Sequence, residues 1–474
     1  MIRLYQSQHE VIIELIKHSS DLGERLRSLE RQKNKNSSNS SKPPSTDQVK
    51  IKKRSRSLRE KSDRPVGGQI GHEGHTLERV SNPDHTELHQ VHECSLCGKS
   101  LDEVQPIDLE RRQVFDLPPM KIEVTEHQSE KKICPRCGCL NQASFPDGVD
   151  QAAQYGNRLK ATAVYLNLYQ FIPYDRLSGL FEDLFEHKPS QATLIEANRL
   201  CYEMVEPAEK AIKAELIKSK VVNFDESGMR IEGLRQWIHV ACTSSLTYYA
   251  AHPSRGSEAN VAMGILPEFK GIAVHDRWRS YYKFDCQHAL CNGHHLRDLK
   301  AITELDGQVW PNDMKQLLLE IKKVADERRP TEFWFDHDEI ERFEKRYDQM
   351  IQKGMLENPP PDPILNPDPP KKRGRKKQTQ AKNLLDGLTE CKSQVLAFMY
   401  NPLVPFDNNQ AERDIRMMKV QQKISGTFRS KAGADMFCRI RGYISTARKN
   451  GVSVIDAIIG AFEGRPFMPP SATL

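Results

Sequence analysis

Leucines recur every seven residues near the start of the chain, which places them on one face of a helix. The series consists of Leu15, Leu22 and Leu29, with Ile12 and Leu26 in the alternate heptad positions. This pattern predicts a helix over residues 4–33 that pairs with a second helix as a short coiled coil. Packing of the helix on its own domain is the alternative.

Apolar residues at helical spacing return after Gly156. They predict helices over 157–170, 174–185 and 190–205, and Ser190 is a suitable N-cap for the third. Two short helices joined by a tight turn resemble a helix-turn-helix. A helical DNA-binding segment is therefore expected over residues 151–215, with an ordinary helical bundle as the alternative.

From Lys220 the pattern changes to short runs rich in β-branched and aromatic residues, separated by turn residues. These runs predict, in order, strands at 221–224, 236–243 and 246–251, a helix at 257–266 and a fourth strand at 271–275. Three consecutive strands, a helix and a further strand form the order that a ribonuclease-H-like core requires. Residues 289–353 are expected to be mainly helical, and helix resumes at Ala381 and Asn409.

Two stretches are too polar or too rich in proline to predict regular structure. Residues 34–47 consist largely of Ser, Asn and Pro, and residues 358–377 contain a dense run of prolines. Basic blocks lie within or beside them, at Lys50 to Arg64 and Lys371 to Lys377. Such local charge favours a polyanionic partner, although a solvated linker gives the same pattern.

Composition narrows the class of protein. With 474 residues, the chain is expected to form about two to four domains. It has no run of about 18 apolar residues and its N-terminus lacks signal-peptide features, so no membrane span or export is expected. Eleven cysteines, an odd number, fit free or metal-bound thiols in a reducing compartment better than disulfides. A cytoplasmic protein is therefore expected.

Four of the cysteines form two Cys-x-x-Cys pairs, each followed directly by glycine. The pairs are Cys94 with Cys97 and Cys134 with Cys137. Thiolates at this spacing on a tight turn can face one ion, and two such turns complete the closed tetrahedral site of structural zinc. One Zn²⁺ is expected in a small β domain over residues 71–150, with strands at 111–119 and 121–127. Cys139 is an inferior alternative ligand, and redox or buried thiol pairs are the alternative interpretation.

Three carboxylates are distinguished by their context. Asp225 ends the first predicted strand, Asp276 ends the fourth, and Glu412 lies just inside a helix that Asp407 or Asn408 would cap. In a ribonuclease-H-like sheet the two strands are neighbours, and a helix laid on the sheet could add the third carboxylate. Oxygen-only ligands suit Mg²⁺ or Mn²⁺. Two such ions would activate a water or a 3′-hydroxyl and stabilise the leaving oxygen of a phosphodiester, the chemistry of strand cleavage and transfer.

Other acidic residues compete for these roles. They are Glu226 for the first position, Asp285 or Asp298 for the second, and Asp407 or Asp414 for the third. An isolated Asp at a strand end is also often a turn former.

Basic residues and histidines lie near the carboxylates in the sequence. Around Glu412 stand Arg413, Arg416, Lys419 and Lys423, which could hold phosphates, although a solvated helix face gives the same pattern. The stretch CQHALCNGHH offers a possible second metal site at Cys286, His288, Cys291, His294 and His295. A structural role for these residues is favoured, with His294 the residue expected to touch DNA or the metal centre.

These motifs together resemble the insertion-sequence-66 family of transposases, of the DDE type. The shared stretches are NSSNSSKPPSTD, GGQIGHEGH, the cysteine pairs with VFDLPP between them, DESG, HALCNGHHLRDLK, NPLVPFDNNQAERDIRMMKVQQKISGTFRS and ISTARKNG. The tract from Pro405 to Ser430 is the most specific. The first motif is Asp-Glu-Ser here, where the family commonly has Asp-Glu-Thr. The second is Asp-Arg-Trp, where the family often has Asp-Gly-Tyr.

The resemblance implies that Asp225, Asp276 and Glu412 are the catalytic triad, with a helical insertion between the second and third. It also implies recognition of terminal inverted repeats and small accessory proteins of the same element. The expected architecture is a multidomain α+β chain. Its parts are a coiled-coil helix (1–33), a flexible basic linker (34–70), the zinc-binding domain (71–150), the helical DNA-binding segment (151–215), a ribonuclease-H-like α/β catalytic domain (216–464, with the insertion at about 300–400) and an irregular tail (465–474).

The expected partners are terminal-repeat and target DNA, and the chain is expected to form a homo-oligomer. Two other functions compatible with the motifs are a ribonuclease-H-like nuclease without strand transfer and a zinc-containing DNA-binding regulator without catalysis.

Overall fold

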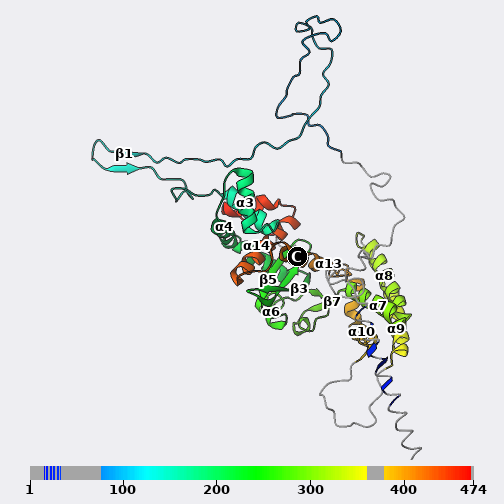
Figure 1. Cartoon of the computed structure of the whole chain (residues 1–474). Helices are drawn as coiled ribbons and strands as arrows, with labels where there is room; N and C mark the ends of the chain where they lie inside the picture. Colours follow the sequence, from blue (N-terminus) through cyan, green and yellow to red (C-terminus); the bar gives the residue numbers. More distant parts are fainter. Residues whose placement is uncertain are drawn as a thin grey trace, which may run out of the picture.

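The computed structural model describes residues 76–331, 333–359 and 378–470, together with scattered positions between 15 and 33 (Figure 1). Those scattered positions are helical, and Leu15, Leu22, Leu26 and Leu29 are exposed. The predicted linker at 34–70 and both basic blocks lie outside the described residues, and helix pairing stays a prediction. Within the described part, no helix is both long and apolar enough to cross a membrane.

A mixed sheet of five strands forms the centre of the larger folded region (Figure 1). Its strands are β3 (Val221–Ile231), β4 (Leu234–Cys242), β5 (Thr247–His252), β6 (Ile272–His275) and β7 (Gln287–Leu290). Their order is β5-β4-β3-β6-β7, with β3, β4 and β5 antiparallel and with β6 and β7 parallel to β3. The four predicted strands are confirmed, and the predicted helix before the fourth is α6 (Ser257–Met263).

The first strand is longer than predicted because a tight hairpin extends it. Glu232 and Gly233, the two residues between β3 and β4, both have positive φ, of 55° and 75°. Two consecutive positive φ values match the right-handed twist of paired strands, so β3 continues to Ile231. Strand β7 was not expected, because residues from 289 onward were predicted to be helical. Its four residues are too few to display a period, and the following helix begins at Asn292.

Alternating residues of β3 face two different cores. Val222 and Phe224 belong to a core with α5 (Glu206–Lys218), α6 and the 3₁₀ turn η3 (Tyr281–Lys283). Met229 and Ile231 face the opposite side of the sheet, where three C-terminal helices pack. Those helices are α13 (Asn409–Ser425), α14 (Lys431–Lys449) and α15 (Val454–Phe462). The faces of β3 therefore decide which side chains reach α13.

Residues 157–204 form helices that pack on α14 and α15. They are α2 (Asn157–Val164), the π-helical turn η2 (Tyr165–Tyr169), α3 (Tyr174–Phe185) and α4 (Gln191–Met204). Ser190 caps α4 as predicted, because its hydroxyl accepts the Thr193 N–H. The turn between α3 and α4 is present, and Leu177, Phe181 and Leu194 form a small core between the two helices.

Helices between β7 and α13 form a further layer beside the sheet (Figure 1). They are α7 (Asn292–Asp306), α8 (Trp310–Arg328), α9 (His337–Glu357), α10 (Gln380–Glu390), α11 (Lys392–Val395) and α12 (Ala397–Tyr400). Asp336 and Glu339 form a capping box at the start of α9, and Trp310, Tyr347 and Leu385 lie in the shared core. These helices occupy most of the range in which the sequence predicts a helical insertion, and the domain boundaries stay a prediction.

Residues 76–150 lie largely in extended segments that run away from the sheet (Figure 1). Their strands are the short pair β1 (Lys131–Ile133) and β2 (Leu140–Gln142), which flank the second cysteine pair. The strands predicted at 111–119 and 121–127 are absent, and that prediction is wrong. The apolar residues of these two segments, including Val114 and Val124, are exposed. Among the described residues, no sheet or helix packs on them. Residues 465–470 after α15 carry no helix or strand, and the rest of the predicted tail lies outside the described residues.

Candidate active site

Asp225 and Asp276 stand at the same level on neighbouring parallel strands. Strands β3 and β6 pair with Asn223 opposite Val274, so the residues two positions further along are Asp225 and Asp276. Asp276 directly follows β6, and its Oδ1 accepts the Trp278 N–H at 3.0 Å. The register alone therefore brings these two candidate carboxylates to one edge of the sheet.

Glu412 reaches the same region from the first turn of α13. The preceding residue Asn408 is buried, and its side chain spans the gap between helix and sheet. Its Nδ2 donates to the Phe224 carbonyl at 2.7 Å, and its Oδ1 accepts from Asn223 at 2.8 Å. These bonds attach the start of α13 to the strand residues immediately before Asp225. Asn408 therefore does not cap the helix with its side chain, and Asp407 Oδ1 accepts only the Asn409 N–H.

Negative charge surrounds the Asp225 carboxyl group. Burial raises the pKa of Asp225 well above its usual range, and the charges of Glu226, Asp276 and Glu412 raise it further. The Glu226 N–H, which donates to Asp225 Oδ1 at 2.8 Å, opposes this rise. Carboxylates held together in this way are relieved by divalent cations, which bind the ionised form through oxygen.

Glu226 lies on the face of β3 opposite to Asp225, where its carboxylate is held by hydrogen bonds. Its side chain is almost fully buried, with Tyr281 donating to Oε2 at 2.6 Å and Arg255 donating to Oε1 at 2.7 Å. Burial and the charge of Asp276 raise its pKa, while both donors lower it. With both carboxylate oxygens occupied, Glu226 is a poorer candidate ligand than Asp225.

Arg255 links this buried carboxylate to the candidate site. Its guanidinium lies 3.6 Å from Asp276 Oδ2 and stacks over the rings of Trp237 and Trp278. No pattern in the sequence pointed to Arg255, because it lies in the turn after β5 and reaches Asp276 only through the fold.

The backbone just after Asp276 is strained. Arg277 has φ of 67°, a conformation that favours glycine. In the family that the sequence resembles, the motif often has glycine at this position. Here the Arg277 guanidinium lies against Gly387 of α10, where a side chain would collide with it. The departure from the family motif is thus accommodated by a glycine on a neighbouring helix.

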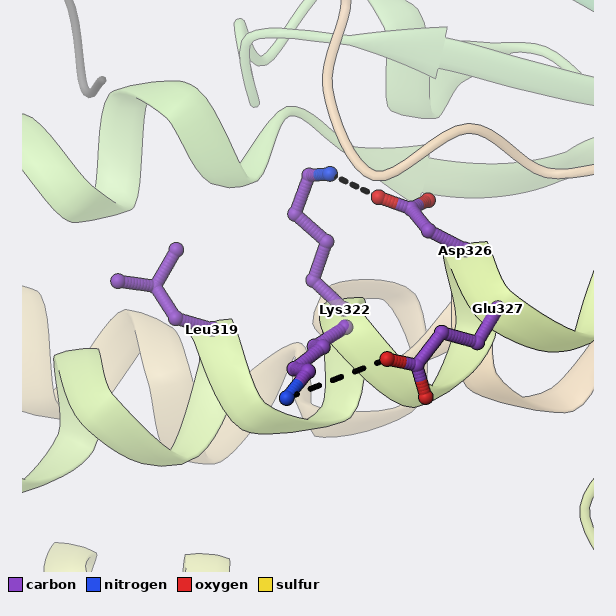
Figure 2. Close-up of a pocket in the computed structure, with 5 residues that line it drawn as sticks. Leu319, Lys322, Asp326 and Glu327 are labelled. Atoms are coloured by element: carbon purple, nitrogen blue, oxygen red, sulfur yellow. Dashed lines mark hydrogen bonds and ion pairs between the residues drawn. The ribbon is translucent and has the colours of Figure 1, made fainter. Parts of the chain in front are cut away.

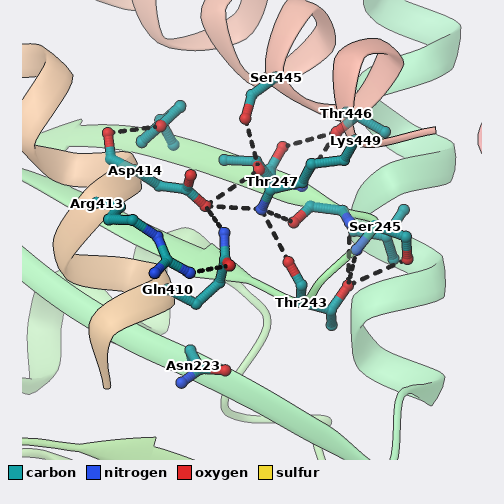
Figure 3. A network of polar contacts seen from close by, with 12 residues as sticks. Asn223, Thr243, Ser245, Thr247, Gln410, Arg413, Asp414, Ser445, Thr446 and Lys449 are labelled. Atoms are coloured by element: carbon teal, nitrogen blue, oxygen red, sulfur yellow. Dashed lines mark hydrogen bonds and ion pairs between the residues drawn. The ribbon is translucent and has the colours of Figure 1, made fainter. Parts of the chain in front are cut away.

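Two of the other rival carboxylates, Asp414 and Asp285, form ion pairs with lysines. Asp414 forms an ion pair with Lys449 at 2.7 Å within a network between α13, α14 and β5 (Figure 3). Asp285 is exposed and pairs with Lys270 at 2.9 Å. Burial raises the pKa of Asp407, and Asp298 lies on α7 one turn after His294. None of them occupies the level of Asp225 on the sheet.

The residues at the start of α7 approach Glu412. Arg297 lies 3.3 Å and His294 Nδ1 3.9 Å from Glu412 Oε1. Among the described residues, the one set of three or more metal-type ligands whose atoms all lie within 4.8 Å of one another is Cys291, His294 and Glu412. Cys286, His288 and His295 are outside this set. The oxygens of the three candidate carboxylates, Asp225, Asp276 and Glu412, do not all lie within 4.8 Å of one another.

The basic residues of α13 differ in whether a phosphate could reach them. Arg413, Arg416 and Lys423 are exposed. Lys419 is half-buried and donates to the Gly228 carbonyl of β3, and burial lowers its pKa. Arg416 and Lys423 thus remain open to a phosphate, on the face that Glu412 shares by helical spacing.

The two cysteine pairs adopt matching tight turns. Gly98 and Gly138 have φ of 69° and 72° and donate their N–H groups to the Cys94 and Cys134 carbonyls. Hydrogen bonds from the backbone N–H groups of Cys97 and Leu96, and then from the Cys97 side chain, lower the pKa of the Cys94 thiol. Similar contacts, the largest from the Cys139 backbone, lower the pKa of the Cys137 thiol. The four thiols are not within 4.8 Å of one another as one set. Each turn has the form of half a zinc site.

A shallow depression elsewhere on the surface does not compete with this site (Figure 2). It lies along α8 and is lined by Leu319, Lys322, Lys323, Asp326 and Glu327. Its charged residues pair with one another at i,i+4 spacing. Such pairs are ordinary features of a solvated helix.

Comparison with known protein families gives three matches. Residues 152–436 match the transposase IS66 family, and residues 92–138 match the zinc-finger binding domain of transposase IS66. Residues 4–78 match a family of unknown function. A search of curated proteins found no match. The first match spans more than half of the chain and contains all three carboxylates, and the second contains both cysteine pairs; the chain belongs to the transposase IS66 family.

Proposed function

We propose that this chain is a DNA transposase that cleaves and joins strands at a two-metal site formed by Asp225, Asp276 and Glu412. The observation that supports it most directly is the convergence of these carboxylates from β3, from the end of β6 and from α13. The sheet order agrees with a ribonuclease-H-like core interrupted by the helical layer before α13. Family membership supports the same reaction class.

The donor set fits Mg²⁺ or Mn²⁺. All three side chains offer oxygen, the ligand atom that these hard divalent ions prefer. When bound, such ions activate the attacking hydroxyl and stabilise the leaving oxygen of the phosphodiester. Asp225 and Asp276 would hold the ions at the sheet edge, and Glu412 would hold them from the helix. Arg255, beside Asp276, would keep that carboxylate oriented.

The remaining parts would position DNA. Arg413, Arg416 and Lys423 are exposed along α13, the helix that carries Glu412, and would contact phosphates. His294 lies beside Glu412 itself and would contact the DNA there. We assign one structural Zn²⁺ to Cys94, Cys97, Cys134 and Cys137, which the zinc-finger match supports. The zinc-binding segment (71–150) and the helices at 151–215 would read the terminal inverted repeats. A pair of N-terminal helices would make the chain a homo-oligomer, and accessory proteins of the same element would join it.

A cleavage and strand-transfer assay tests the proposal. The substrate is DNA carrying the inverted repeats that flank the coding region, with Mg²⁺ present. Asp225→Asn, Asp276→Asn and Glu412→Gln should each reduce both reactions by on the order of 10³-fold while leaving DNA binding intact. Asp285→Asn, at an exposed carboxylate outside the site, is the matched control. Hydrolysis without joining would identify a nuclease, and unchanged function in all three variants would identify a non-catalytic regulator.

A further inference from the structure

One cluster near the proposed catalytic site combines three different ligand atoms. Cys291 is the residue before α7, His294 lies in the first turn of α7, and Glu412 lies in the first turn of α13. The Cys291 sulfur, a His294 ring nitrogen and a Glu412 oxygen all lie within 4.8 Å of one another. The mechanism proposed above requires neither the thiol nor the imidazole.

The spacing of these atoms does not suit direct hydrogen bonding. His294 Nδ1 lies 3.9 Å from Glu412 Oε1, beyond the range of a hydrogen bond. That nitrogen is buried and has no hydrogen-bond partner, which is costly for a polar atom. Two ligands of a tetrahedral zinc ion stand about 3.4 Å apart, given bonds of about 2.05 Å. A single ion between the two side chains would therefore satisfy both after a small adjustment.

The sulfur is also prepared for a ligand role. Cys291 is 1% exposed, and its Sγ accepts the Asn408 N–H at 3.1 Å. Hydrogen bonds of this kind orient a ligand from outside the metal site. Because Asn408 is the residue bound to β3, the same residue would hold the thiol and the carboxylate-bearing helix in place. Arg297, which lies 3.3 Å from Glu412 Oε1, is the existing cation that an ion would have to displace.

We propose that Cys291, His294 and Glu412 form a second transition-metal site that binds Zn²⁺ in preference to Mg²⁺. Sulfur and imidazole ligands select zinc over magnesium, and a water or a substrate oxygen would complete four-coordination. The thiol would release its proton to solvent when the ion binds. Zinc held here would compete for Glu412 with the catalytic ions. This consequence rests on the proposed function, whereas the binding site itself does not.

Metal binding to the full-length chain tests the site without any DNA or turnover. Metal-free protein is loaded with Zn²⁺ and its content is measured, and Co²⁺ is used as a spectroscopic probe of thiolate ligation. Cys291→Ser and His294→Gln should each bind one equivalent less than the wild type. Each variant should also show weaker cobalt–thiolate absorption than the wild type, because the ion bound through Cys291 and His294 is lost in both. Cys286→Ser, a nearby cysteine outside the cluster, should match the wild type.

Circular dichroism identifies which variants are folded. Loss of one equivalent in every ligand variant that is folded, with Cys286→Ser unchanged, supports the site. A folded ligand variant that binds as much metal as Cys286→Ser overturns it. The zinc of the N-terminal cysteine pairs is present in every protein compared and cancels in the difference. Strand transfer by the carboxylate variants is measured in a separate assay. The proposed function can therefore fail while the zinc site is supported, and the zinc site can fail while the proposed function is supported.

Discussion

Lys449 of α14 donates to Asp414 of α13 at 2.7 Å, and each of these side chains is only 12% exposed (Figure 3). The same ammonium donates to the carbonyls of Thr243 and Leu246 in the turn between β4 and β5. Asp414 is two residues after Glu412, so the two carboxylates point in different directions from α13. The pair thus fixes the rotation of the helix and, with it, the direction of Glu412.

Replacing Lys449 with Met should destabilise the fold strongly. The substitution leaves Asp414 charged and almost buried without its cation, a situation that costs about 3–5 kcal/mol. Urea denaturation followed by circular dichroism measures the free energy of unfolding. Lys431→Met, which breaks the exposed pair with Asp435 on the same helix, should change it by less than about 0.5 kcal/mol. Equal effects in the two variants would show that the buried pair does not hold α13.

Asn408→Ala should weaken both the fold and metal binding. It leaves the Phe224 carbonyl and the Asn223 amide without partners in a buried setting, at a cost of about 2 kcal/mol. Because α13 would then be less firmly attached to β3, Mg²⁺ affinity should fall as well. Isothermal titration with Mg²⁺ and urea denaturation measure the two effects. Asn409→Ala, at the neighbouring exposed residue, should leave both quantities near the wild-type values.

The sequence indicates which strands carry the candidate carboxylates better than it indicates which face of the sheet each carboxylate occupies. Asp225 and Asp276 were identifiable because each follows an apolar run, and the observed register aligns those runs. The choice between Asp225 and Glu226 depends on which face of β3 the helix α13 covers. That contact joins residues almost two hundred positions apart, so no local pattern reveals it. The same reason hides the role of Asn408, whose sequence context indicates only a helix start.

In the zinc-binding segment the local turns were predictable from the sequence, whereas the strands between them were not. Its cysteine spacing and following glycines are local features, and the turns they predict are present. The predicted strands between the pairs are absent because alternation alone does not form a sheet, and those residues have no covering partner. Strand β7 was missed for a related reason, since its four residues are defined by pairing with β6.

Removing zinc should expose the segment between the cysteine pairs to proteases. Metal affinity at a four-cysteine site supplies folding free energy, so a chelator should release one zinc and increase trypsin cleavage within residues 92–138. Cys134→Ser should show the same sensitivity without chelator. Cys438→Ser, at a buried cysteine of α14, is the control and should resemble the wild type. If cleavage is unaffected by chelation, zinc does not organise this segment.

Acid should destabilise the protein through its buried histidines. Burial lowers the pKa of His239 to about 4 and those of His275 and His295 to about 3. Below the ordinary value of 6.5 the unfolded chain takes up protons that the folded chain does not. Stability is therefore complete above pH 6.5 and falls as pH decreases toward the folded pKa, by up to about 1.4 kcal/mol per pH unit for each histidine.

Urea denaturation at pH 6.5 and at about pH 5 measures this loss. His295→Gln removes one of the titrating groups, and its stability should depend less steeply on pH than that of the wild type. The comparison concerns the slope, so a constant loss from imperfect packing does not affect it. An unchanged slope in this variant would mean that His295 is protonated in the folded state.

Asp225→Asn should stabilise the metal-free protein while removing its response to Mg²⁺. Because burial and three neighbouring carboxylates raise the folded pKa of Asp225, its contribution to stability declines as pH rises above the ordinary value of 3.8. An uncharged amide avoids that loss at neutral pH, so the melting temperature without metal should rise.

The response to Mg²⁺ should change in the opposite sense. Wild-type protein should gain about 2.7 kcal/mol of stability at a free Mg²⁺ concentration of about 100 times Kd, and the variant should gain much less. Thermal melting with and without Mg²⁺ measures both changes, with Asp285→Asn as the control that should behave like the wild type. If Asp225→Asn melts at a lower temperature without metal, the carboxylate is stabilised by the fold rather than strained by its neighbours, and the electrostatic argument for cations at this site is lost.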